Sequence, residues 1–249
     1  MEPGRLEGLV PRMPALSHDD TETMVSPAEA LEAFVRRRDF PCVGAKSALA
    51  RGRLKIMTAR SLTSGWNDLA IHDALLDWAD EYERDRKAGG DPEFRSLAVL
   101  FENAAPMSER EFERALWDRV QSLTDKDAWR GQDYDASVSA DPDDPHFSLS
   151  FGGQAFFVVG LHPGASRPAR RFAYPALIFN LHEQFEQLRA DGRYESMREA
   201  ILARDVTLAG SINPMLARHG EKSEARQYSG RAVNEDWKCP FSDPRSDAA

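Results

Sequence analysis

The stretch 156–172 (FFVVGLHPGASRPARRF) combines residue types that can hold a ligand. It runs from an apolar segment into His162, and a Pro-Gly turn then leads to Arg167, Arg170 and Arg171. An imidazole can ligate a metal, and guanidinium groups bind carboxylates or phosphates through paired hydrogen bonds. A histidine satisfied within the core and a solvated cationic loop would explain the same residues. The stretch therefore predicts a candidate ligand site, with both interpretations open.

Two further histidines and the cysteines are alternative ligands. His182 lies on a predicted helix, and His219 lies in a predicted loop. Cys42 and Cys239 have no cysteine or histidine at metal-ligand spacing, so a structural zinc site is unsupported. Each thiol is either a small buried apolar group or an axial thiolate.

The segment 210–241 is long and polar, and it has no apolar periodicity. Structureless loops of this length are uncommon in a domain, so we expect the segment to be either disordered or pinned across a site. Its run 223–230 (SEARQYSG) is dense in hydrogen-bonding groups, which are costly to bury unless they are paired. Over a pocket, such a run could hold a polar substrate.

Composition and charge exclude several classes of protein. The net charge of −9 and the pI of about 5.2 argue against a surface for nucleic acid, which needs a basic face. No apolar run approaches the ~20 residues of a membrane-spanning helix, and the first residues lack the pattern of a secretory signal. Residues 44–47 (GAKS) do not complete a phosphate-binding loop, and no G-x-G-x-x-G fingerprint occurs. Two cysteines suit a reducing compartment, so we expect a cytoplasmic protein that binds neither membranes nor nucleic acid.

The elements that would position these residues follow from local patterns. Ser26, Pro27 and Glu29 form a helix start, with a capping side chain, a proline at the first helical position and an acid three residues after the cap. Ser108 and Glu111 open a later helix in the same way. Apolar periodicity predicts helices over 26–38, 66–86, 108–123, 174–189 and 193–204. It predicts strands over 54–59, 94–101, 146–151 and 154–161.

Gly152 and Gly153 join the last two strands as a hairpin, and residues 40–48 and 125–145 are expected to be connections. This order of elements is that of an α+β chain, in which a mixed sheet of about four strands is covered by helices. No internal repeat and no mid-chain linker occur. We therefore expect a flexible segment over 1–25, a single domain over 26–241 and a flexible tail over 242–249.

Five motifs together resemble the YqcI/YcgG family, and the resemblance covers roughly residues 34–241. They are FPCVGAKSA (40–48), LHPGASRPARRF (161–172), FNLHEQFEQLR (179–189), GSINPMLARHGEKSEARQYSG (210–230) and DWKCPF (236–241). Several long motifs in a fixed order are far more specific than one short pattern. Members of this family include haem-dependent N-hydroxylases that act on arginine or other guanidino groups in natural-product pathways, such as those to guanitoxin and cycloserine.

The resemblance implies a b-type haem and a set of residues around it. His162 would be the axial ligand to the iron, with Cys42, His182 and His219 as alternatives. Arg167, Arg170 and Arg171 would lie near the haem propionates, and Phe156 and Phe157 would contact the porphyrin. A guanidinium group needs planar oxygen acceptors, for which Asn213, Glu221 and Glu224 are the candidates.

The resemblance thus implies a haem-dependent monooxygenase that N-hydroxylates arginine or an arginine-like substrate with dioxygen. Electrons would come from an external donor, because no flavin or nicotinamide fingerprint occurs. A homodimer is one option for its assembly. The alternative is a haem-binding carrier or sensor without turnover, or a binding module that shares only the scaffold.

Overall fold

A five-stranded sheet with the strand order β1-β2-β5-β4-β3 forms the centre of the fold. The computed structural model describes residues 25–89, 94–103, 105–218 and 220–246. β1 and β2 are parallel, whereas the other neighbouring strands are antiparallel. The strands are β1 (Leu54–Ala59), β2 (Ser96–Phe101), β3 (Leu149–Phe151), β4 (Gln154–Leu161) and β5 (Ala176–Leu181). The expected α+β single domain with a mixed sheet is confirmed, with five strands instead of about four.

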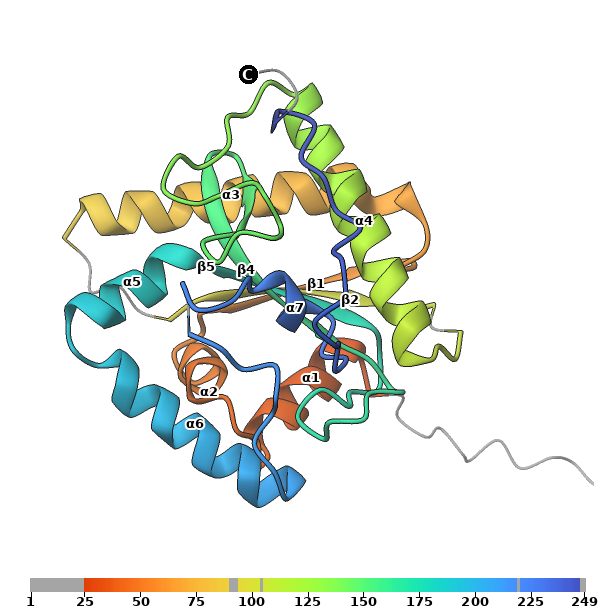
Figure 1. Cartoon of the computed structure of the whole chain (residues 1–249), viewed down its shortest axis with the longest axis vertical. Helices are drawn as coiled ribbons and strands as arrows, with labels where there is room; N and C mark the ends of the chain where they lie inside the picture. Colours follow the sequence, from red (N-terminus) through yellow and green to blue (C-terminus); the bar gives the residue numbers. More distant parts are fainter. Residues whose placement is uncertain (1–24, 90–93, 104, 219, 247–249) are drawn as a thin grey trace, which may run out of the picture.

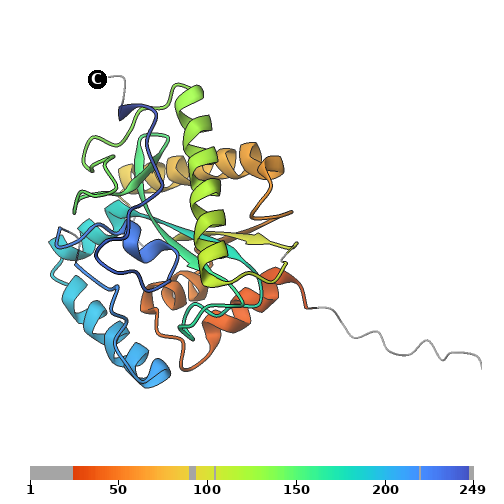
Figure 2. The same ribbon diagram turned by 45° about the vertical axis from the view of Figure 1, so that its right-hand side comes forward.

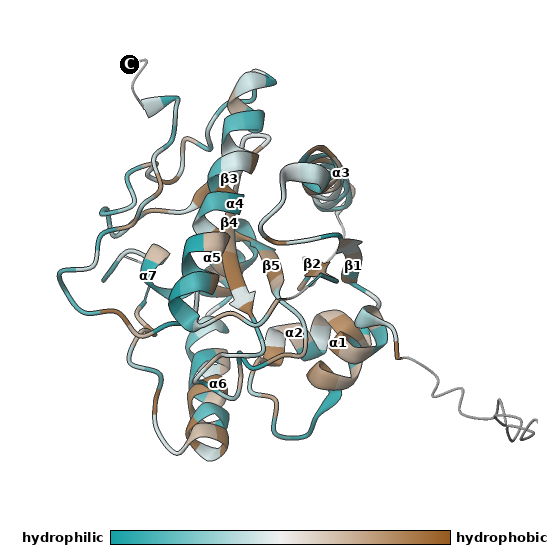
Figure 3. Cartoon of the chain, turned by 90° about the vertical axis from the view of Figure 1, so that its right-hand side faces the viewer, coloured by the Kyte–Doolittle hydropathy of each residue, from teal (hydrophilic) through white to brown (hydrophobic). Residues whose placement is uncertain are grey.

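Helices cover both faces of the sheet (Figures 1 and 3). On one face lie α3 (Asp68–Lys87) and α4 (Glu109–Trp129), which pack on each other and on the sheet. On the opposite face lie α1 (Pro27–Arg36) and α2 (Val43–Ala50), with α6 (Tyr194–Ala209) packed against α2. The sheet therefore separates two apolar cores. No helix in the described part of the chain is long and apolar enough to cross a membrane.

Local signals in the sequence predict the starts of α1 and α4 correctly. Ser26 and Glu29 form a capping box before α1, because each side chain accepts a hydrogen bond from the backbone N–H of the other. Ser108 and Glu111 do the same before α4. α4 continues six residues past the predicted end at residue 123 and stops at Trp129.

Two predicted elements are wrong. The helix predicted over 174–189 is instead β5 followed by α5 (His182–Ala190). β5 is a central strand of a sheet with an apolar core on each face, so both of its faces are covered, and its sequence ALIFNL lacks the alternation that would distinguish a strand from a helix. The connection predicted over 40–48 contains α2, which is capped at its N-terminus by Cys42.

The described part of the segment 210–241 is pinned across the fold. The predicted ligand His219 and the first 24 residues lie outside the described residues. Its short helix α7 (Ala225–Tyr228) packs against β4. The chain then runs beside α4 (Figure 2), where Gln121 exchanges two hydrogen bonds with the backbone of Ser242.

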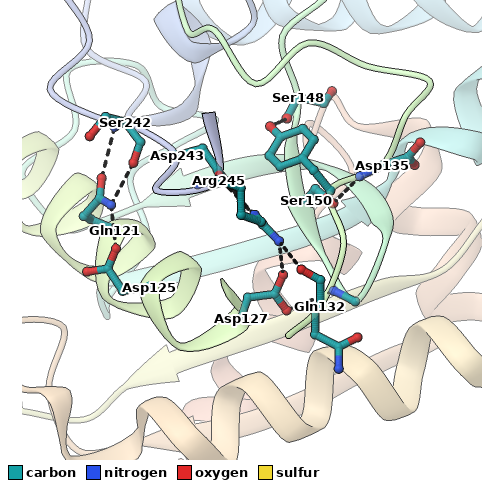
Figure 4. A network of polar contacts seen from close by, with 12 residues as sticks. Gln121, Asp125, Asp127, Gln132, Asp135, Ser148, Ser150, Ser242, Asp243 and Arg245 are labelled. Atoms are coloured by element: carbon teal, nitrogen blue, oxygen red, sulfur yellow. Dashed lines mark hydrogen bonds and ion pairs between the residues drawn. The ribbon is translucent and has the colours of Figure 1, made fainter. Parts of the chain in front are cut away.

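Packing also extends beyond residue 241, where we expected the folded domain to end. Asp243 is buried, and Arg245 Nη1 lies 2.9 Å from Oδ2 of the buried Asp127 (Figure 4). Oδ1 of Asp127 contacts His72 Nε2 at 2.6 Å and accepts the Gly152 N–H at 3.0 Å. This cluster fastens residues 242–245 to α3, α4 and the hairpin.

Candidate functional site

A cavity of about 290 Å³, here called the main cavity, lies on the sheet face that α1 and α2 cover. Its floor comes from β1, β2, β4 and β5, and its walls come from α1, α2, α5, α6 and residues 213–227. The walls are mostly apolar, and this volume is close to that of small ligand sites. The lining side chains used below are Cys42, Phe157, Arg170, His182, Arg189, Arg198, Asn213 and Glu224.

The alternation of β4 divides the two aromatic residues expected to contact a porphyrin. Phe157 lines the main cavity. Phe156 points to the opposite face, where its ring centroid lies 5.9 Å from that of Trp78 and 6.4 Å from that of Phe179. Because successive strand residues point to opposite faces, only Phe157 can contact a ligand in this cavity.

His162 is buried, but it is not among the residues that line the main cavity. Its ring stacks on that of Phe112 in α4, with centroids 4.2 Å apart and an angle of 15° between the planes. Its Nδ1 has no hydrogen-bond partner among the described residues. Burial lowers the pKa of the imidazole, so His162 is neutral at pH 7. These contacts are those of a core histidine, the alternative left open by the sequence.

The three arginines after His162 bind the protein itself. Arg167 pairs with Asp205 and donates to the backbone oxygen of Ser211 at 2.7 Å. Arg171 donates to the backbone oxygens of Ala165 and Ser166 at 2.8 and 2.9 Å. These contacts close the turn and attach it to the end of α6. The guanidinium groups of Arg167 and Arg171 would have to give up these bonds to bind propionates.

Arg170, which lines the main cavity, fastens the segment 223–230 to β4. Its guanidinium donates to the backbone oxygens of Gly160, Gln227 and Tyr228 at 3.0, 3.1 and 3.3 Å. Burial lowers the pKa of Arg170 to about 10, which leaves it charged at neutral pH. The backbone of β4 at Gly160 lies close to α4 and to the segment 223–230. A Cβ atom on Gly160 would lie 2.7 Å from the Phe112 ring and 2.9 Å from the Tyr228 backbone oxygen.

The three residues expected to hold a guanidinium do not lie together. Glu224 is buried and lines the main cavity; its Oε1 accepts hydrogen bonds from the Tyr228 hydroxyl at 2.8 Å and from Ser148. Asn213 also lines the cavity, but its Oδ1 accepts the backbone N–H of Met215. Glu221 is exposed.

At the surface, Glu221 Oε1 lies 3.6 Å from Arg218 Nη1, outside the set of cavity residues. Its side chain is 54% exposed, so it cannot exclude water from a bound cation. The structure thus brings Glu224 and Asn213 to the main cavity and leaves Glu221 outside it.

Two of the alternative ligands line the main cavity. His182 is the first residue of α5; it is buried, and its Nε2 lies 3.6 Å from Glu186 Oε1. Cys42 Sγ accepts the Ala45 N–H at 3.4 Å, and burial raises the pKa of the thiol, which is therefore protonated at neutral pH. No group of three or more His, Cys, Asp or Glu side chains is arranged to hold a metal ion among the described residues.

The cavity face of α6 was missed at the sequence level. Tyr194, Arg198 and Asp205 line the cavity together with the apolar residues Met197, Ile201 and Leu202. Their spacing of three, one, three, one and three residues marks one face of a helix, which is the signal that could have identified them. Arg198 makes no hydrogen bond or ion pair with any residue that the structure describes. Its charge is available to an anionic group in the cavity.

Comparison with known proteins identifies the family. The model of the YqcI/YcgG family matches residues 31–242, which is most of the chain and includes every strand and helix described above except the first turn of α1. Searches of curated proteins and of solved structures returned no match. The chain belongs to the YqcI/YcgG family.

Proposed function

We propose that this protein is a haem-dependent N-hydroxylase that acts on the guanidino group of arginine or an arginine-like substrate in natural-product biosynthesis. Family membership supports the reaction class. The observation that carries the proposal is that a buried carboxylate, Glu224, and a buried imidazole, His182, line the same apolar cavity. Together they supply an acceptor for a cation and a ligand for iron.

The residues around the main cavity fit a b-type haem. An imidazole is a common axial ligand to haem iron, and His182 supplies one in the cavity wall. Arg198 and Arg189 line the same cavity and could pair with propionate carboxylates, although Arg189 also pairs with Glu186. Apolar side chains, including that of Phe157, would contact the porphyrin. We therefore place the iron ligand at His182 in preference to His162.

When bound, the haem would supply the dioxygen chemistry, while the protein supplies binding and orientation. Glu224 would accept hydrogen bonds from the planar guanidinium group, as carboxylates do. The hydroxyl of Tyr228 and that of Ser148 hold the carboxylate in place. The apolar walls exclude water, which strengthens the attraction between the two charges. The electrons would come from a separate donor protein or reductant.

An absorption spectrum of the purified protein reconstituted with haem is the first test. We expect a Soret band at one haem per chain, and its absence would refute the haem assignment. The second test incubates the loaded protein with arginine, a reductant and oxygen, and measures the products by mass spectrometry. A gain of one oxygen atom is expected on a guanidino substrate. A stable haem complex that oxidises none of the guanidino compounds tested would instead indicate a carrier or sensor.

A further inference from the structure

Three oxidisable aromatic side chains form a continuous line from the main cavity towards the surface. Tyr228 and Trp117 are stacked, with ring centroids 5.6 Å apart. Trp117 is next to Trp237, with centroids 6.4 Å apart. Tyr228 and Trp117 are buried, whereas Trp237 is partly exposed. Neighbouring rings in this line are thus in or close to van der Waals contact.

The inner end of this line touches the wall of the main cavity in two ways. The Tyr228 ring packs edge-on against Phe157, with centroids 5.5 Å apart. The Tyr228 hydroxyl donates to Glu224 Oε1 at 2.8 Å. Phe157 and Glu224 both line the cavity. An oxidant in the cavity would therefore reach Tyr228 through one intervening side chain, with a proton acceptor already in place.

We infer that Tyr228, Trp117 and Trp237 carry oxidising equivalents, one electron at a time, from the main cavity to the protein surface. This inference rests on the proposed function, because a one-electron oxidant derived from dioxygen or peroxide must form in the cavity. The line would act when no substrate is bound and the oxidant would otherwise damage the cavity wall.

Electrons move inward along the line from one residue to the next, and one proton moves between Tyr228 and Glu224. Tyr228 gives one electron to the oxidant and its phenolic proton to the Glu224 carboxylate. The tyrosyl radical then takes an electron from Trp117 and recovers the proton from Glu224. Oxidised Trp117 takes an electron from Trp237, and oxidised Trp237 takes one from a thiol in solution. The thiol releases its proton and becomes a thiyl radical, and two thiyl radicals combine to a disulfide. The net change is one electron from the thiol to the oxidant.

The surroundings of the three residues suit this sequence of steps. Burial and the neighbouring carboxylate raise the pKa of Tyr228 well above its usual value, so the residue is a protonated phenol whose oxidation requires proton transfer. The indole N–H of Trp117 has no hydrogen-bond partner among the described residues. An oxidised Trp117 therefore keeps its proton and passes the charge on.

At the outer end, the Arg226 guanidinium lies 5.6 Å from the centre of the Trp237 ring. A cation over the ring disfavours a second positive charge there. Oxidised Trp237 is therefore a strong oxidant, which a thiol in solution readily reduces.

The first experiment uses the haem-free protein, so that it does not depend on cofactor binding. Azidyl radicals from pulse radiolysis oxidise accessible tryptophans, and the background Trp66→Phe/Trp129→Phe removes the two that are most exposed. Oxidation from solution runs the line in reverse across the same ring contacts, so we expect a tryptophanyl radical that converts to a tyrosyl radical at a rate independent of protein concentration. Trp117→Phe should abolish this conversion, and Tyr228→Phe should abolish the tyrosyl signal. Conversion that persists in folded Trp117→Phe or Tyr228→Phe protein would overturn the inference.

Phenylalanine keeps much of the ring packing, and circular dichroism verifies that each variant is folded. Should Trp117→Phe not fold, Trp237→Phe at the partly exposed end is the second variant, and it should also abolish the conversion. The haem-loaded protein is then treated with peroxide without substrate. Oxidation products at Trp237, found by peptide mass spectrometry and lost in Tyr228→Phe, are the expected result. Failure to bind haem would refute the proposed function, while the radiolysis experiment tests separately whether the three residues transfer electrons.

Discussion

The imidazole of His162 lies almost parallel to the ring of Phe112, with the two centroids 4.2 Å apart. Phe112 belongs to α4, on the sheet face opposite α1 and α2, so this contact anchors the end of β4 to the α3/α4 core. His182, at the end of the neighbouring strand β5, lines the main cavity on the other face. Because β4 and β5 are antiparallel, the two histidines lie at opposite ends of this strand pair, and they serve different faces of one sheet.

Replacement of each histidine by phenylalanine should separate these roles. We expect His182→Phe to lose haem after reconstitution and gel filtration, because its imidazole is the proposed iron ligand. His162→Phe should keep the haem content of the wild-type protein, because its ring can still pack on Phe112. The carbon monoxide difference spectrum of the wild type should indicate imidazole and not the thiolate of Cys42. Normal haem content in His182→Phe together with its loss in His162→Phe would reverse the assignment.

The buried His162 also predicts a pH dependence of stability. Burial lowers its pKa in the folded state below the value of 6.5 for an exposed imidazole. Between the two pKa values the unfolded state binds more protons than the folded state. The stability that the neutral, buried imidazole contributes is therefore present above about pH 6.5 and is lost as the pH falls. The free energy of unfolding of His162→Phe should therefore fall less than that of the wild type between about pH 7.5 and pH 5.5, with an upper limit of about 1.4 kcal/mol for the binding of one proton. Parallel curves from urea titrations would contradict this prediction.

Glu224 and Glu221 form a matched pair for testing substrate binding, since one lines the cavity and the other is exposed. Glu224→Gln keeps the size of the side chain but removes the charge. We expect it to weaken binding of arginine to the haem-loaded protein by about 10- to 100-fold, the loss typical of a charged hydrogen bond. Glu221→Gln should leave binding unchanged. Equal effects in the two variants, measured by calorimetry, would exclude Glu224 as the specific acceptor.

The ion pair between Arg245 and Asp127 should contribute to stability although it lies near the C-terminus. Asp127 is fully buried, and Arg245→Met would leave its carboxylate without that partner. The expected loss in the free energy of unfolding is about 2–3 kcal/mol, below the range for a fully buried pair because Arg245 is 19% exposed.

Lys238→Met is the control for Arg245→Met, because it removes an exposed pair with Asp143 from the same segment. It should cost less than about 1 kcal/mol. Similar losses for the two variants in urea titrations would show that burial of Asp127 is not the cause.

The parts of the fold that local signals specify were predictable. Gly152 and Gly153 have φ angles of 60° and 73°, as a two-residue hairpin turn requires, and they identified the β3–β4 hairpin. β5 was not predictable, because an apolar core on each face of the sheet removes the alternation on which a strand assignment depends. Its true neighbours, β2 and β4, are set by pairing across the whole sheet.

The site was predictable in its residue types and not in their partners. Arg170 has the chemistry of a carboxylate clamp, yet its bonds go to backbone oxygens as far as 58 residues away, at Tyr228. No local pattern reports such a partner. Likewise, whether Phe156 or Phe157 faces a ligand depends on which helices cover each face of β4. The residues that line the cavity from α6 had a helical spacing that a search for one-sided patterns would have found.

The Arg170 bonds that join β4 to the segment 223–230 bear on when the protein can acquire a cofactor. Chains fold from the N-terminus as they are synthesised. The sheet and the helices α1 to α6 can therefore assemble while the ribosome still holds the segment 223–230. One wall of the main cavity, with Glu224 and Gln227, is then missing. Capture of a ligand in its final environment must therefore follow the emergence of residues 223–230 from the ribosome.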